Sequence, residues 1–110
     1  YFTAAYYEKA RILERTFRYQ EAAETYQASF EFEGPSGYSY YKIGLCYLNM
    51  YNTEKALSWF TKAIQDDPDL DEAYYELSLI NDEQKTHQNN KKRKQILINK
   101  TIALVIGIKK

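Results

Sequence analysis

Apolar and small residues between Gly37 and Asp69 recur at a spacing that fits two successive helices. The first set falls at i, i+3, i+4 and i+7 and therefore shares one helix face: Tyr40, Ile43, Gly44 and Tyr47. The second set places small residues around a large ring: Ala56, Phe60, Ala63 and Ile64. Because Gly44 has no side chain, a neighbouring helix can approach closely there and Phe60 can fill the gap. The spacing predicts a helical hairpin.

The residues around these two segments agree with helix ends. Asn52 can accept a backbone N–H bond as the N-cap of the second helix, with Glu54 and Lys55 in its first turn. Pro68 stops that helix, because proline cannot continue the hydrogen-bond ladder. The hairpin is therefore expected to end in the acidic turn around Pro68.

This pattern resembles the tetratricopeptide repeat family, whose repeats are about 34 residues long. A step of one repeat back from Tyr40, Ala56 and Phe60 reaches Tyr6, Ala22 and Tyr26. A step forward reaches only the first helix of a third repeat. The resemblance implies an all-α fold in which antiparallel helix-turn-helix hairpins stack as a short right-handed superhelix. The expected organisation is a repeat array at 1–84, with repeats at about 3–36 and 37–70 and one helix at 71–84, then a tail at 85–110.

The flanking repeats depart from the family pattern at several positions. In the first repeat, Lys9 replaces a large apolar residue, Ala10 replaces the glycine and Ser29 replaces an alanine. In the third, Asn81 and Asn90 stand where an aromatic residue and an alanine are expected. Two and a half repeats are close to the minimum of three for stability. We therefore expect either self-association or an array that belongs to a longer one.

In the family the first helix of each repeat lines a concave groove that binds protein partners. Carried over by the repeat spacing, this resemblance implies the following groove residues: Tyr7, Arg11, Glu14, Arg15, Tyr38, Tyr41, Lys42, Leu45, Leu48, Asn49, Glu72, Tyr75, Glu76 and Leu79. We expect that these residues are not needed for packing within a hairpin and that they bind a helix or an extended peptide with apolar anchors. The alternative is that the charges are merely solvated and that the tyrosines reflect a chain with 12 of them.

Some family members grip the C-terminal EEVD carboxylate of heat-shock chaperones with cations and amides at fixed groove positions. Those positions here are Tyr7, Arg11, Lys42, Glu72 and Glu76. Two acids at a carboxylate clamp repel the ligand, so no binding to such tails is expected. A ligand that is acidic at one end and basic at the other would fit better.

The net charge of the chain is zero, but acidic and basic residues are concentrated in different parts of it. Residues 1–84 hold all 15 acids and seven Lys or Arg, a net charge of −8, whereas residues 85–110 hold eight bases and no acid. The segment from Asn81 to Gln95 is polar and is expected to be a linker or a fraying helix. The apolar segment from Ile96 to Ile108 has 13 residues, fewer than the roughly 20 that span a bilayer.

Four interpretations of this tail remain open. It can supply a displaced second helix that caps the third repeat, or begin a membrane-proximal segment through residues 91–110. It can also mediate self-association. Nuclear import or nucleic-acid binding at residues 91–94 is disfavoured, because no aromatic residues interleave the cations.

The residues for catalysis are sparse. His87 is the only histidine and Cys46 the only cysteine, which excludes a zinc site of the usual kind and an internal disulfide. The acids at 66, 67, 69 and 71 fit an inter-repeat turn better than a calcium loop. We expect no enzyme activity, no metal and no cofactor.

The sequence therefore predicts a protein-interaction scaffold, with a cytoplasmic location. The alternative is the sensory or scaffolding part of a larger membrane-associated regulator. A helical accessory subunit of an enzyme complex would look the same at this length.

Overall fold

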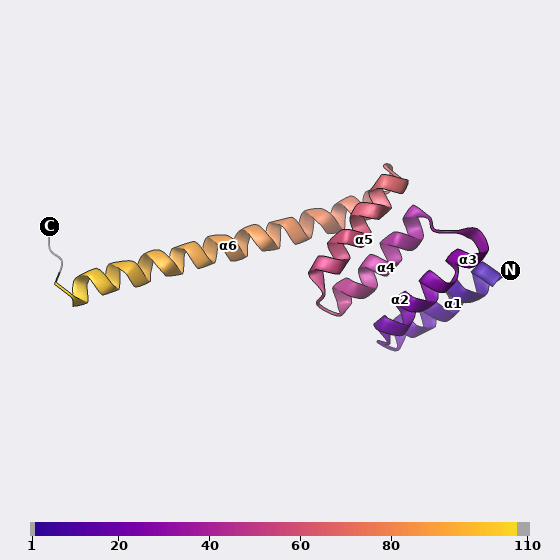
Figure 1. Ribbon diagram of the computed structural model, residues 1–110, viewed down its shortest axis with the longest axis horizontal. Helices are drawn as coiled ribbons and strands as arrows, with labels where there is room; N and C mark the ends of the chain where they lie inside the picture. The colour runs from indigo at the N-terminus through magenta and orange to yellow at the C-terminus, as the bar shows by residue number, and fades with distance from the viewer. Residues whose placement is uncertain (1, 108–110) are drawn as a thin grey trace. The chain divides into compact units, whose positions relative to one another are not determined.

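The computed structural model describes residues 2–107, and every regular element within them is an α-helix (Figure 1). The helices are α1 (Phe2–Arg15), α2 (Tyr19–Ala28), α3 (Phe30–Glu33), α4 (Gly37–Asn49), α5 (Thr53–Asp66) and α6 (Asp71–Val105). The chain divides into two compact units, one ending at Leu77 and one beginning at Ser78. The end of the predicted apolar segment, at residue 108, lies outside the described residues.

The hairpin of α4 and α5 has the predicted form. Phe60 and Ile43 are fully buried, and a Cβ atom added to Gly44 would lie 2.6 Å from Cε1 of Phe60. That distance is shorter than any real contact, so glycine is what permits the ring to enter. The predicted close approach of the two helices at Gly44 is confirmed.

Side chains cap both helices of this hairpin. The Asn52 side chain accepts a bond from the Lys55 N–H at 3.2 Å, which confirms the predicted N-cap. The Ser36 hydroxyl accepts a bond from the Ser39 N–H, a cap that was not predicted. Asp66 was expected only to be part of the acidic turn around Pro68. In the structure its Oδ2 also accepts a bond of 2.7 Å from the Gly37 N–H. This bond ties the end of α5 to the start of α4.

The first hairpin, α1 with α2, tolerates its departures from the family pattern. Ala10 is fully buried at the glycine position, and Lys9 is exposed. Ser29 is buried at the alanine position and satisfies its hydroxyl by donating to the Tyr26 carbonyl at 2.6 Å. A small side chain is enough at both buried positions, and helix α2 packs against α4 to stack the two hairpins.

Helix α3 was not predicted. After Ser29 the chain makes one more short helix, which ends at Gly34 with a φ of 77°. Phe32 in this helix stacks on the rings of Phe2 and Tyr6 at centroid distances of 5.1 and 5.4 Å. The extra turn therefore covers the beginning of α1 with an aromatic cluster.

The structure differs from the expectation of a linker or fraying helix at residues 81–95, because α6 is one continuous helix from Asp71 to Val105. A second helix folded back as a cap would need a turn, and a continuous helix has none. The physical reason is that no glycine or proline stands between Asp69 and Ile106, while Gln, Glu and Lys favour helix. Within residues 2–107, no helix has the length and apolar content needed to cross a membrane.

Cys46 gives a test of the packing in α4. Its side chain is fully buried, and burial raises the pKa of the thiol to about 12. We expect the folded chain to resist a thiol reagent such as DTNB and the unfolded chain to react with it fully. Because the folded-state pKa is raised, the stability contributed by the neutral thiol is complete below its ordinary pKa and is lost as pH rises toward 12. Fast reaction of the native chain at neutral pH would contradict this burial.

Candidate functional site

Three tyrosines join the first helices of the two hairpins. The rings of Tyr7 in α1 and Tyr38 in α4 lie 6.4 Å apart, and those of Tyr38 and Tyr41 lie 6.3 Å apart. We call Tyr7, Tyr38 and Tyr41 the tyrosine row. The predicted groove positions of two repeats thus form one aromatic surface.

The expectation that groove residues make no packing contacts within a hairpin was wrong for two of these rings. Tyr7 meets Tyr26 of its own hairpin edge-on at 5.5 Å, and Tyr41 lies 6.0 Å from the buried Phe60. A tyrosine ring is long enough to contact the second helix at one edge and the groove at the other. Tyr38, by contrast, keeps 48% of its surface exposed.

An acidic pocket lies where α4 meets the first turns of α6. It has a volume of about 490 Å³ and is lined by Tyr41, Asp71, Glu72, Tyr75 and Glu76. Burial, followed by the charges of Glu76 and Glu72, raises the pKa of Tyr41. Asp71 was missed as a groove residue, although its place one turn before Tyr75 could have identified it. The pocket presents carboxylates beside two aromatic rings.

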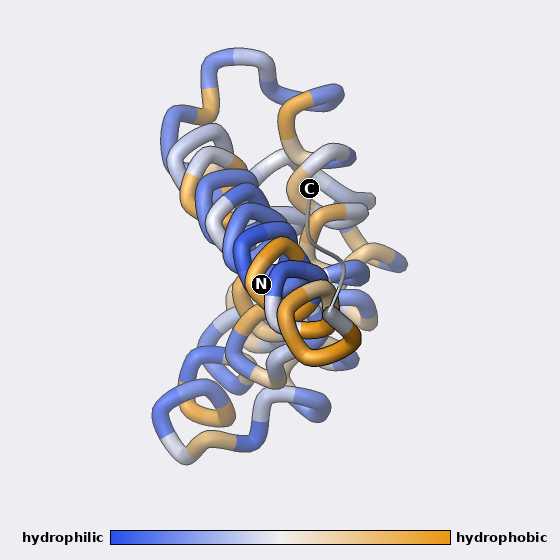
Figure 2. The backbone as a smooth tube through the Cα atoms, turned by 90° about the vertical axis from the view of Figure 1, so that its left-hand side faces the viewer, coloured by the Kyte–Doolittle hydropathy of each residue, from blue (hydrophilic) through white to orange (hydrophobic). Residues whose placement is uncertain are grey.

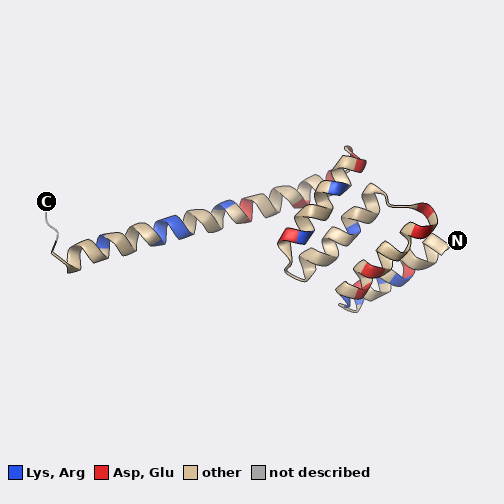
Figure 3. Cartoon of the chain, viewed as in Figure 1, with Lys and Arg blue, Asp and Glu red and all other residues tan. Residues whose placement is uncertain are grey.

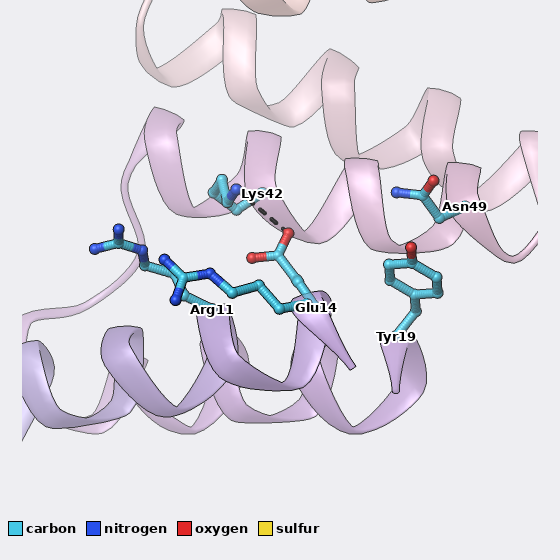
Figure 4. Close-up of a pocket in the computed structure, with 6 residues that line it drawn as sticks. Arg11, Glu14, Tyr19, Lys42 and Asn49 are labelled. Carbon is cyan, nitrogen blue, oxygen red and sulfur yellow. Dashed lines mark ion pairs between the residues drawn. The ribbon is translucent and has the colours of Figure 1, made fainter. Parts of the chain in front are cut away.

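A basic pocket lies between α1 and α4 (Figure 4). It has a volume of about 330 Å³ and is lined by Arg11, Glu14, Arg15, Tyr19, Lys42 and Asn49. Tyr19, at the start of α2, was not among the predicted groove residues. In Figure 4 its ring points toward the side chain of Asn49. Helix α4 therefore contributes to both pockets.

Glu14 binds two neighbouring side chains at the basic pocket. Its Oε1 lies 3.3 Å from the Lys42 ammonium, with side-chain exposures of 17% for Glu14 and 19% for Lys42, and its Oε2 accepts a bond of 2.5 Å from the Tyr26 hydroxyl. Burial and this bond raise the pKa of Tyr26. The pair neutralises Lys42 and links α1, α2 and α4.

The remaining cations of this pocket are more available. Arg11 pairs with Glu8 at 3.4 Å on the exposed surface, where such a pair contributes little. Arg15 is exposed and has no ion pair among residues 2–107. The pocket therefore carries an excess of positive charge from two guanidinium groups.

The other predicted groove residues divide between the two units. Leu45 and Leu48 are half-buried on α4, and Asn49 is exposed with its Nδ2 donating to the Leu45 carbonyl at 3.0 Å. Leu79 belongs to the unit that begins at Ser78, so it is not assigned to either pocket. The described residues contain no cluster of three or more metal-ligating side chains.

Stacked helical hairpins with a row of partly exposed aromatic residues define a helical-repeat scaffold. Family models described as tetratricopeptide repeat match residues 3–33 and 37–70, which together make up more than half of the chain. The chain belongs to the tetratricopeptide repeat family. Repeats of this family are generally protein–protein interaction modules and are typically non-catalytic. No curated protein matches the sequence.

Proposed function

We propose that the surface formed by the tyrosine row and the two pockets binds a segment of a partner protein, as a helix or an extended peptide. The observation that carries this proposal is the continuity of the aromatic surface. The tyrosine row runs from α1 to α4, and its last member, Tyr41, also lines the acidic pocket together with Tyr75. A bound segment could thus contact the first helix of each repeat.

The row suits binding because its rings are already held in place. Contacts with Tyr26 and Phe60 fix Tyr7 and Tyr41, so little side-chain entropy is lost when a partner covers their outer edges. Tyrosine offers an apolar face and a hydroxyl, and such residues are common hot spots of interfaces. Among the aromatic residues of this surface, Tyr38 and Tyr75 are exposed, at 48% and 62%.

The charges of the two pockets suggest the polarity of the partner. Arg11 and Arg15 favour acidic residues at the basic pocket, whereas Asp71, Glu72 and Glu76 favour basic residues at the acidic pocket. A chaperone EEVD tail does not fit this pattern. Its carboxylate would meet Glu72 and Glu76, and Lys42 is already paired with Glu14.

Selection from a displayed peptide library tests this function. The full chain should select peptides with an apolar anchor between an acidic end and a basic end. Reversing the charge of the acidic pocket with Glu72→Lys and Glu76→Lys should weaken binding of the selected peptides by about tenfold or more, since like charges across an interface cost several kcal/mol. Titration calorimetry measures the change.

The matched control places the same charge change away from the pockets, with Glu24→Lys and Glu54→Lys, two exposed residues of α2 and α5. This variant should bind the selected peptides as the original chain does. Equal losses in both variants would contradict the assigned site, and so would tight binding of an EEVD peptide.

A further inference from the structure

The chain is exposed and apolar where α6 ends. Residues 102–106 are five consecutive apolar residues, preceded by Ile96, Leu97 and Ile98. All of them except Ala103 are exposed, and Ala103 is half-buried. Successive residues of a helix are 100° apart, so the four helical residues 102–105 spread over about 300° of its circumference. Figure 2 shows this hydrophobic stretch at the C-terminal end of α6.

A ring of positive charge precedes this apolar end. Lys91, Lys92, Arg93 and Lys94 occupy four successive positions, which also surround the helix. No acidic residue occurs between Glu83 and the end of the described chain, and within α6 Figure 3 shows acidic residues only in the part nearer the repeat array. The helix thus changes within a few residues from these four cations, which we call the cationic collar, to the apolar end at residues 96–106.

We propose that residues 91–106, the last part of α6 and the residue after it, dock on a lipid bilayer that carries anionic headgroups. The cationic collar lies at the level of the headgroups, and the apolar side chains of residues 96–106 insert beneath them. The charge complementarity favours this occupant, because Lys and Arg beside an apolar helix bind anionic lipids. Lys109 and Lys110 follow the apolar residues in the sequence, and a steep entry would carry these charges into the hydrocarbon, so we expect the helix to dock at a shallow angle.

The dimensions agree with this arrangement. The ten helical residues 96–105 measure about 15 Å, half of a hydrocarbon core of about 30 Å, so the segment can dock on one leaflet without spanning the bilayer. Asn99, Lys100 and Thr101 interrupt the apolar segment. Side chains of a helix lean toward its N-terminus, so the stem of Lys100 extends back toward the headgroups and its ammonium can reach them.

A second copy of the chain is a less suitable occupant. A two-stranded coiled coil needs an apolar seam with residues about 3.5 apart, and residues 81–95 contain no apolar residue. The apolar end by itself provides only about two turns beyond Lys100. This inference does not depend on peptide binding by the groove.

Vesicle flotation with the full chain tests the proposal. We expect it to float with vesicles of phosphatidylcholine mixed with phosphatidylserine, and much less with phosphatidylcholine alone. Changing the four residues of the collar to glutamine should lower the partition coefficient at least about tenfold, because each cation near an anionic surface contributes about 1 kcal/mol. The matched control removes four cations from the repeat array and should bind vesicles as before: Lys9→Gln, Arg18→Gln, Lys55→Gln and Lys62→Gln.

A fluorescent probe tests insertion directly. A Leu104→Cys variant labelled with NBD should brighten on addition of anionic vesicles, and the same label at Glu83→Cys should not. Native Cys46 is fully buried and is not expected to react with the label. Leu104→Asn combined with Ile106→Asn should abolish flotation while leaving the collar intact.

Two results would overturn the proposal. One is flotation that is absent, or equal for neutral and anionic vesicles. The other is a dimer in analytical ultracentrifugation without lipid that is lost in the Leu104→Asn, Ile106→Asn variant, together with no brightening of the probe at position 104. That combination would assign the apolar end to a second copy of the chain.

Discussion

Replacing Phe60 with alanine is expected to lower the free energy of unfolding of the repeat array by about 3–5 kcal/mol. The ring is fully buried and lies against Gly44, which has no side chain that could move into the vacated space. Tyr41, at a centroid distance of 6.0 Å, would lose its packing partner as well. Since small domains are stable by only about 5–15 kcal/mol, this single change removes a large part of the total.

Urea unfolding followed by the fluorescence of Trp59 measures this loss. Trp59 is the only tryptophan and lies in α5 next to Phe60, so its signal reports on the array and not on the end of α6. The control is Tyr51→Ala, which removes a ring that is 94% exposed and should change stability by less than about 0.5 kcal/mol. Equal effects of the two variants would show that Phe60 does not hold α4 against α5.

The second large effect is expected on binding. Tyr41→Ala combined with Tyr75→Ala should weaken binding of the selected peptides by at least about 2 kcal/mol, or roughly thirtyfold in affinity, because both rings line the acidic pocket. Calorimetry with one selected peptide gives the affinity. Tyr41 also packs near Phe60, so the urea midpoint of the double variant must be measured alongside.

Tyr74→Ala is the matched control for this pair. Tyr74 is partly exposed, lies next to Tyr75 on α6 and does not line the pocket. We expect this variant to bind the peptide as the original chain does. Undiminished affinity in the double variant would place the binding surface elsewhere.

The second hairpin was predictable almost residue by residue. Its signals are local: Gly44 beside a large ring at Phe60, a capping Asn52 and a stop at Pro68. Helix α3 and the continuity of α6 were not predicted. The family spacing suggested a turn after the first helix of the third repeat. The residues there include no helix breaker, so their helix propensity lets α6 continue.

The candidate site was only partly predictable. The repeat spacing identified Tyr38, Tyr41 and Tyr75, because groove positions recur with the period of the repeat. It missed Asp71 and Tyr19, which reach the pockets from the first turn of a helix and from a second helix. It listed Glu14 and Lys42 as separate groove residues and did not predict that they pair.

The sequence by itself therefore determined the class of fold, the hairpin that packs around Gly44 and Phe60, and the separation of an acidic array from a basic, apolar helix end. These properties follow from the order of residues along one or two helices. Only the tertiary structure decided which groove residues contact one another. The bonds of Glu14 with Lys42 and Tyr26 join three helices, and they depend on distances that are set when the hairpins stack.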